Sequence, residues 1–203
     1  MNPRARIALV SSCAVLALGL VSCSTDGDSE PTAVTTSIGP TSTDPTTTAE
    51  AEPESVPESA TVQTAEASDG ARLTVTDIRV GRHEGFDRIV YEMDGTGTPG
   101  WRVGYVDSAV QDGSGRELDV DGAGILQVLI DGSAYPFDSG VAEYSGPVPV
   151  PGTGDGGSVT EVQGALVFEG VTQSFVGTAQ PDAAFAVTGL ENPTRVVVDV
   201  AHE

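Results

Sequence analysis

From residue 72 onward, apolar and polar residues alternate in short segments. Alternation at period two is typical of strands with one buried face, and no window shows the i, i+3, i+4, i+7 spacing of an amphipathic helix. Runs rich in Gly, Pro and Asp separate the segments and favour turns. The pattern predicts an all-β domain of about eight short strands, arranged as a sandwich or a barrel. The predicted strands are 72–80, 87–93, 100–110, 125–130, 159–170, 172–179, 185–190 and 194–200.

Two of these segments carry the same arrangement of charges. In FDRIVYEMDG (86–95), Arg88 and Glu92 match Arg195 and Asp199 of TRVVVDV (194–200) in order and spacing. Parallel pairing in register would set like charges opposite each other, whereas antiparallel pairing would set Arg88 against Asp199. We therefore expect the two strands to pair antiparallel or to lie in separate sheets, with apolar residues inward and the charges outward.

The first 22 residues have the pattern of a signal peptide rather than of a folded element. A basic start, MNPRAR, is followed by 15 apolar or small residues, which is short for a membrane span and suits a signal peptide. Leu20-Val21-Ser22-Cys23 resembles the lipobox of bacterial lipoproteins, which implies that Cys23 takes a diacylglyceryl group and begins the mature chain. The alternatives are a secreted protein with a stray cysteine and an uncleaved anchor.

The segment 23–70 differs in composition from the segment 71–203. It is rich in Thr, Ser, Pro, Ala and acidic residues and contains no aromatic or basic residue. Such a segment buries too little apolar surface to offset its chain entropy, so we predict a disordered stalk. All ten aromatic residues lie between Phe86 and Phe185, which predicts a folded domain at 71–203.

Charge and cysteine content exclude several classes of function. All nine basic residues are Arg, and the segment 71–203 holds 20 acidic residues and 7 Arg, a net charge of −13, which argues against nucleic-acid binding. No cysteine follows Cys23, so no disulfide, thiolate nucleophile or cysteine metal site is expected in the segment 71–203. The two histidines, His83 and His202, are interpreted as surface residues, no loop fits the calcium-binding pattern, and no cofactor is predicted.

Aromatic residues in Gly-rich stretches form the candidate ligand-binding loop. They are Trp101, Tyr135, Phe137 and Tyr144. Such side chains can stack on sugar rings, but they more often close the ends of a sandwich core.

The ordered motifs VTDIRVGRHEGFDRIVYEMDGTGTPGWRVGYV, YPFDSG, FEGVTQSFVG and NPTRVVVDV resemble the AMIN-like domain of actinobacterial lipoproteins. The resemblance spans nearly all of 71–203. That domain is similar to the AMIN domain found beside cell-wall amidases and in pilus secretins. The resemblance implies a β-sandwich in the cell envelope that binds components such as peptidoglycan and is not itself catalytic.

These observations together predict a non-enzymatic protein on the extracytoplasmic face of the cell membrane, anchored by lipid on Cys23. Its domain would bind a wall polymer such as peptidoglycan, or an envelope protein, and no nucleic acid. One alternative is an envelope hydrolase that uses Glu92 and Asp199, because glycosidases use two carboxylates at a defined separation. Another is a non-catalytic subunit of an envelope protein complex.

Overall fold

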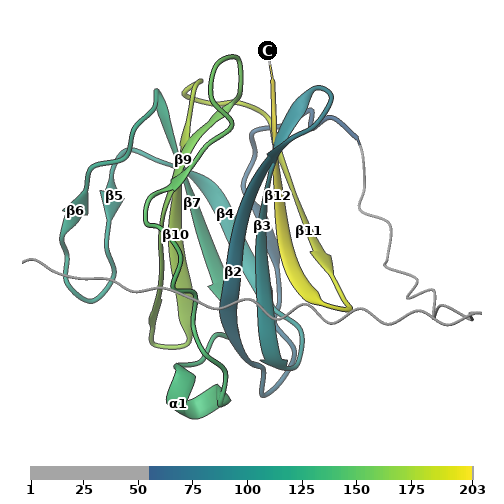
Figure 1. Cartoon of the computed structure of the whole chain (residues 1–203), viewed down its shortest axis with the longest axis vertical. Coiled ribbons are helices and arrows are strands. Elements are labelled where there is room, and N and C mark those ends of the chain that lie inside the picture. Colours follow the sequence, from purple (N-terminus) through teal and green to yellow (C-terminus); the bar gives the residue numbers. More distant parts are fainter. Residues whose placement is uncertain (1–54, 203) are drawn as a thin grey trace, which may run out of the picture. The chain divides into compact units, whose positions relative to one another are not determined.

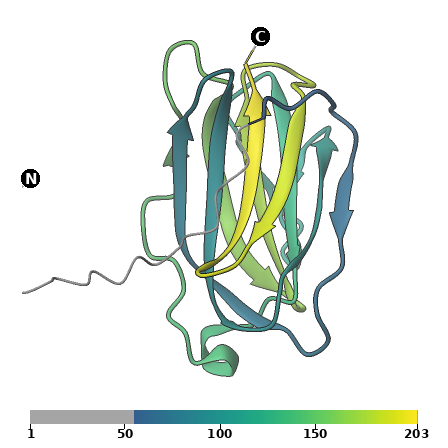
Figure 2. The same cartoon turned by 90° about the vertical axis from the view of Figure 1, so that its right-hand side faces the viewer.

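The computed structural model describes residues 55–202, and two antiparallel sheets face each other in it (Figure 1). The six-stranded sheet has the order β1-β4-β7-β10-β9-β8, and the four-stranded sheet has the order β11-β12-β3-β2. Figure 2 looks onto the four-stranded sheet, with the six-stranded sheet behind it. The strands of the six-stranded sheet are β1 (Gln63–Ala65), β4 (Gly100–Val106), β7 (Gly124–Asp131), β8 (Val150–Pro151), β9 (Val159–Phe168) and β10 (Val171–Thr178). Those of the four-stranded sheet are β2 (Arg72–Arg82), β3 (Phe86–Thr96), β11 (Phe185–Leu190) and β12 (Thr194–Ala201).

The core between the sheets follows from the alternation in the sequence. In β7, the buried residues Leu126, Val128 and Ile130 alternate with residues that are only partly buried. Each such buried side chain contributes about 1.5–3 kcal/mol relative to an exposed one. Inward-facing residues of both sheets complete the core, among them Leu73, Ile78, Ile89, Tyr91, Val103, Val162, Val176, Phe185, Val196 and Val198.

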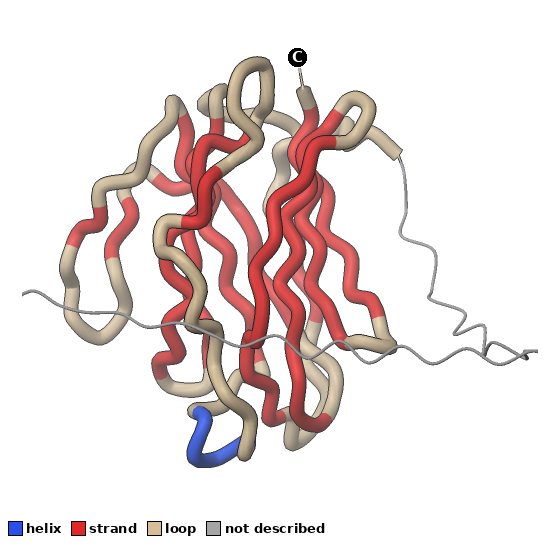
Figure 3. Tube along the Cα trace, in the orientation of Figure 1, coloured by secondary structure: helices blue, strands red, loops and turns tan. Residues whose placement is uncertain are grey.

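The sequence predicts this architecture well. The all-β sandwich is confirmed, and each of the eight predicted segments contains a strand. The alternation did not reveal the short strands β1 and β8 or the single helical turn α1 (Pro136–Ser139), which Figure 3 shows at one end of the sandwich. Residues 63–65 lie inside the segment predicted as a stalk, so the folded part of the chain begins before residue 71.

The matching charges of β3 and β12 also pair as expected. The two strands are antiparallel neighbours, with Arg88 opposite Asp199 and Glu92 opposite Arg195. The charges do not face solvent, however, because Arg88, Arg195 and Asp199 are buried. The outward-facing surface of this sheet is therefore less exposed than the pattern suggests.

A small hairpin covers part of the outer face of the six-stranded sheet. It consists of β5 (Ala109–Val110) and β6 (Glu117–Leu118) and lies outside β10 and β9 in Figure 1. The side chain of Gln173 on β10 holds it: its amide donates to the Val110 carbonyl at 3.1 Å, and its carbonyl accepts from the Asp112 amide at 2.8 Å. Ala109 and Phe175 are buried.

The predicted signal peptide, the lipid site Cys23 and most of the predicted stalk lie outside the described residues. Within residues 55–202, no helix has the length and apolar character that crossing a membrane requires.

Candidate functional site

The helical turn α1 is fixed to the edge of β2 at one end of the sandwich. After β7, the chain crosses to β2, where the Leu73 amide donates to the Gly132 carbonyl and the Ala134 amide to the Leu73 carbonyl. Pro136 begins the turn, where its missing N–H costs nothing. Gly140 ends it with a φ of 75°, which favours glycine, and donates to the Pro136 carbonyl.

Hydroxyl groups beneath α1 hold the turn further. The Thr74 hydroxyl donates to the Ala134 carbonyl at 2.9 Å and lies 2.7 Å from the Ser139 hydroxyl. The Ser133 hydroxyl donates to the Ile130 carbonyl and accepts from the Thr172 amide. The position of α1 is therefore set by the ordered strands on either side of it.

Tyr135 and Phe137 project from this fixed turn as an exposed aromatic platform. Their rings stack with centroids 5.3 Å apart and an angle of 8° between the planes. Phe137 is 82% exposed and Tyr135 is 37% exposed. A single exposed apolar residue carries little information, but two stacked rings on a fixed turn form a ready-made contact surface with one polar group, the Tyr135 hydroxyl.

The other two predicted loop aromatics do not join the platform. Trp101 lies in β4, packs against the core and reaches Gly189 on β11. Tyr144 packs partly against the core, and its hydroxyl donates to the Pro147 carbonyl at 3.0 Å. Both side chains close the sandwich, which is the alternative that the sequence left open for such residues.

The platform lies at the end of the sandwich opposite to the point where the described chain enters. The first residues of β2 contact the α1 segment, and β2 then runs 11 residues, about 30 Å, to the far end. There Val56 lies against Gly85, whose carbonyl accepts from the His202 amide. Figure 1 shows α1 at one end and the C-terminus at the other.

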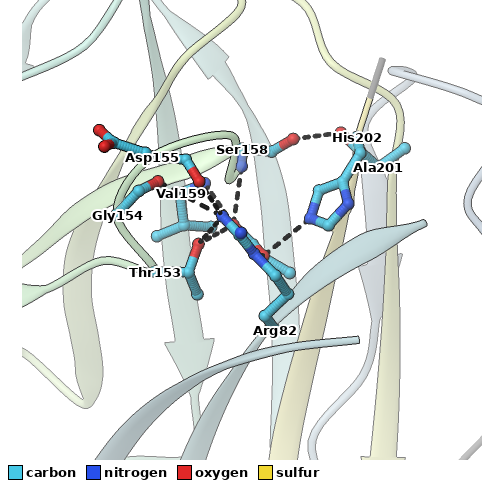
Figure 4. A network of polar contacts seen from close by, with 9 residues as sticks. Arg82, Thr153, Gly154, Asp155, Ser158, Val159, Ala201 and His202 are labelled. Carbon is cyan, nitrogen blue, oxygen red and sulfur yellow. Dashed lines mark hydrogen bonds and ion pairs between the residues drawn. The ribbon is translucent and has the colours of Figure 1, made fainter. Parts of the chain in front are cut away.

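At that far end, a buried carboxylate gathers polar groups from three parts of the chain. Asp87 is fully buried and accepts hydrogen bonds from the Thr153 hydroxyl and from the amides of Ser158 at 2.7 Å and Val159 at 2.9 Å. Nε2 of His202 lies 2.8 Å from its second oxygen. Figure 4 shows these groups converging together with Arg82, whose Nε is 3.7 Å from the carboxylate. We call these six residues the Asp87 cluster.

The Asp87 cluster is arranged to stabilise a negative charge. Burial alone would raise the pKa of the Asp87 carboxyl, but hydrogen bonds from Thr153, His202, Val159 and Ser158 lower that pKa below its ordinary value. The Ser158 hydroxyl donates to the Ala201 carbonyl at 2.6 Å and not to the histidine. The arrangement is therefore a carboxylate held by donors, not a serine activated by a base.

The interpretation of His202 as a surface residue is wrong, because its ring contacts the buried Asp87. His83 does lie in the β2–β3 turn, with its ring stacked on Phe86 at 4.9 Å. A signal for the cluster was present in the sequence: alternation places Asp87 on the same face as Ile89 and Tyr91, which point into the core. An acid at a core-facing position requires partners.

The two carboxylates of the hydrolase alternative do not converge. Asp199 forms a bidentate pair with Arg88, with distances of 2.7 and 2.8 Å, and Glu92 binds Arg79 at 2.9 Å. Because Asp199 lies opposite Arg88, four residues from Glu92, the two acids are separated by about 13 Å along the sheet. Within residues 55–202, no group of three or more His, Cys, Asp or Glu residues is placed to hold a metal ion.

Comparison with known proteins gives one family. The family model described as the AMIN-like domain matches residues 73–202. Neither the curated proteins nor the solved structures contain a significant match. The matched segment is well over half of the chain and includes both sheets except β1. The protein therefore belongs to the AMIN-like family, which indicates an extracytoplasmic protein of the cell envelope.

Proposed function

We propose that this protein is a lipid-anchored envelope protein whose domain binds peptidoglycan through the aromatic platform of Tyr135 and Phe137. The signal-peptide pattern and the lipobox-like Leu20–Cys23 segment support the anchor on Cys23. Two acyl chains hold a protein on a membrane stably, so the anchor would persist after cleavage of residues 1–22. The segment after Cys23 acts as a stalk.

The exposed stacked pair on α1 is the observation that carries this proposal. Folding does not require it, since Phe137 keeps 82% of its surface exposed. A rigid aromatic surface loses little conformational entropy when it binds, and it can cover the apolar face of a sugar ring. The net charge of −13 over 71–203 disfavours contact with carboxylate groups, so the proposed contact is with the uncharged sugar rings of peptidoglycan.

The position of the platform supports the same function. The described chain enters at the Gly85 end, and the platform lies about 30 Å away at the other end. A domain held through its N-terminal stalk can therefore direct Tyr135 and Phe137 away from the membrane and toward the wall.

The proposed function is binding without catalysis. AMIN-like domains are generally non-catalytic binding domains. The carboxylates considered for hydrolysis, Glu92 and Asp199, are each engaged by an arginine and do not flank a common space. An acid and a base that act on one glycosidic bond must lie roughly 5–10 Å apart.

Co-sedimentation with purified peptidoglycan tests the proposal. The chain beginning at residue 23, with Cys23→Ser at the lipid site, provides protein without the anchor, and Phe137→Ala is introduced into it. We expect the aromatic truncation to weaken binding about tenfold, which corresponds to about 1.4 kcal/mol. Val148→Ala, an exposed apolar residue outside the platform, is the matched control and should bind like the parent.

Two results would overturn the proposal: no co-sedimentation of the parent at low and moderate salt, or equal binding by Phe137→Ala and the control. Retention of a purified envelope protein instead of peptidoglycan would favour the subunit alternative. Mass spectrometry of the wild-type protein from membranes tests the anchor separately, because a diacylglyceryl group on Cys23 adds a defined mass to the first residue.

A further inference from the structure

A hollow lies between the turn of the β5–β6 hairpin and strand β9, on the outer face of the six-stranded sheet. It has a volume of about 470 Å³, within the range of small-molecule sites. Two large apolar side chains line it and remain exposed, Leu166 at 52% and Phe168 at 40%. Its other lining residues are Gln111, Asp112, Gly113, Ser114, Val167 and Gln173.

The turn that forms one wall of the hollow is internally braced. The Gln111 amide donates to the Arg116 carbonyl, the Gly115 amide to the Gln111 carbonyl, and the Ser114 hydroxyl to the Gln111 side chain at 2.6 Å. Gly113 has a φ of 76°, and a Cβ atom there would lie 2.7 Å from the Phe168 ring. Glycine therefore allows the turn to approach the ring closely.

The chemistry of the hollow fits an uncharged sugar ring. Phe168 and Leu166 offer an apolar wall for the C–H face of a pyranose. At the rim, the Asp112 carboxylate accepts no side-chain hydrogen bond from residues 55–202, and the Gln111 side-chain nitrogen donates none to them, so both are available to hydroxyl groups. No arginine lines the hollow, and an anionic ligand would meet the negative charge of Asp112 at the rim, which the nearby Arg102 compensates only in part because it also pairs with Asp131.

The hollow and the aromatic platform lie at the same end of the sandwich. Phe168 is two residues from Gly170, whose carbonyl accepts from the Ser133 amide at 2.9 Å, and Ser133 is two residues from Tyr135. Through these connections, the Cα atoms of Phe168 and Tyr135 lie at most roughly 22 Å apart. Figure 1 shows α1 next to the β9–β10 turn. One polysaccharide strand of several sugars can reach both.

We propose that the hollow is a second sugar-binding subsite, which with the platform holds a single glycan strand. This inference rests on the proposed function and narrows its ligand to the glycan part of the wall, rather than the peptide part. Two weak subsites on one rigid domain strengthen each other when a single ligand spans them, because the second contact forms at a high effective concentration.

Titration of the Cys23→Ser chain that begins at residue 23 with uncharged β-1,4-linked oligomers of N-acetylglucosamine tests this inference. Backbone amide NMR shifts report the site of contact. We expect a disaccharide to bind weakly and to shift residues 111–114 and 166–168, and a long oligomer to bind about tenfold or more tightly. Phe168→Ala and Asp112→Asn should each remove most of the increase in affinity with oligomer length. The controls Val148→Ala and Asp119→Asn should keep this increase.

The outcomes separate this inference from the proposed function. If Phe168→Ala and Asp112→Asn bind long oligomers like their controls, the subsite is refuted, even where Phe137→Ala still weakens binding to peptidoglycan. If the parent binds peptidoglycan but no oligosaccharide shifts 111–114 or 166–168, the subsite is also refuted and the proposed function stands. If an oligosaccharide shifts the amide signals of 111–114 and 166–168, and Phe168→Ala abolishes these shifts, the subsite is supported. This holds even where Phe137→Ala has no effect.

Discussion

The two ends of the sandwich use their conspicuous side chains in opposite ways. At the Gly85 end, Asp87 and His202 have the residue types of a catalytic site, yet every contact they make ties one part of the fold to another. At the α1 end, Tyr135 and Phe137 have no reactive group, and their outer surfaces meet solvent.

This difference gives a criterion for telling structural from functional residues: whether a side chain still has hydrogen-bonding capacity or exposed surface that the fold does not use. The Asp87 carboxylate is saturated by donors and closed to solvent, so it has little capacity left for a ligand. The platform is held firmly from below by Thr74 and Ser139 while its upper surface has no partner within residues 55–202. Substitution at one end should therefore change stability, and at the other end binding.

The largest expected effect comes from Asp87→Ala. The substitution leaves the amides of Ser158 and Val159 without their acceptor and removes the partner of His202. We expect the free energy of unfolding to fall by about 3–5 kcal/mol, as for other buried charged groups that lose a partner. Chemical denaturation measures this, with Glu84→Gln, in the exposed turn nearby, as the control. A loss below about 1 kcal/mol would show that the cluster is not a main support of this end.

An intermediate effect is expected from acid. The folded-state pKa of Asp87 is lowered below its ordinary value of 3.8, so its stabilising contribution is complete above that value and is lost as the pH falls toward the folded-state pKa. Arg82 and His202, which face the carboxylate, lose their anionic partner in the same range. The stability difference between wild type and Asp87→Asn, measured by denaturation at several pH values, should therefore shrink below pH 3.8. A constant difference would contradict this account.

The smallest effect on stability is expected from Phe137→Ala. Because the side chain is mostly exposed, its removal should change the free energy of unfolding by less than about 0.5 kcal/mol. The same variant should bind peptidoglycan about tenfold more weakly. Substitution at the α1 end would then weaken binding with little loss of stability, whereas substitution at the Gly85 end would reduce stability. A stability loss above about 1.5 kcal/mol would instead mean that the platform supports the fold, and the contrast between the two ends would disappear.

The sequence predicts the strands well because the residues of this sandwich alternate with little interruption. The charges predicted that β3 and β12 are not parallel neighbours, but they left open whether the strands pair antiparallel or lie in separate sheets; the structure shows antiparallel pairing, with Arg88 opposite Asp199. Burial of these charges could not be predicted in this way. Alternation assigns a side chain to a face, but it does not reveal how closely the neighbours pack.

The long-range contacts were also beyond sequence reasoning. Thr153 and His202 meet Asp87 across separations of 66 and 115 residues, and no local pattern marks either one as its partner. The same limit applies to the candidate aromatics. Tyr135 and Phe137 are exposed because α1 projects from the sandwich, whereas Trp101 and Tyr144 turn inward, and only the three-dimensional path of the chain distinguishes the two pairs.

The way the chain enters the domain has a mechanical consequence. Strand β1 pairs with β4 of one sheet, while the side chain of Gln63 donates to the Phe185 carbonyl at 2.7 Å and accepts from the Val187 amide at 2.9 Å on β11 of the other sheet. In the lipid-anchored protein that we propose, tension would enter the fold through the N-terminal segment, where the Ser59 carbonyl accepts from the Phe185 amide before β1 is reached. Contacts of this segment with both sheets would then share the load, so that a pull would not act on a single strand alone.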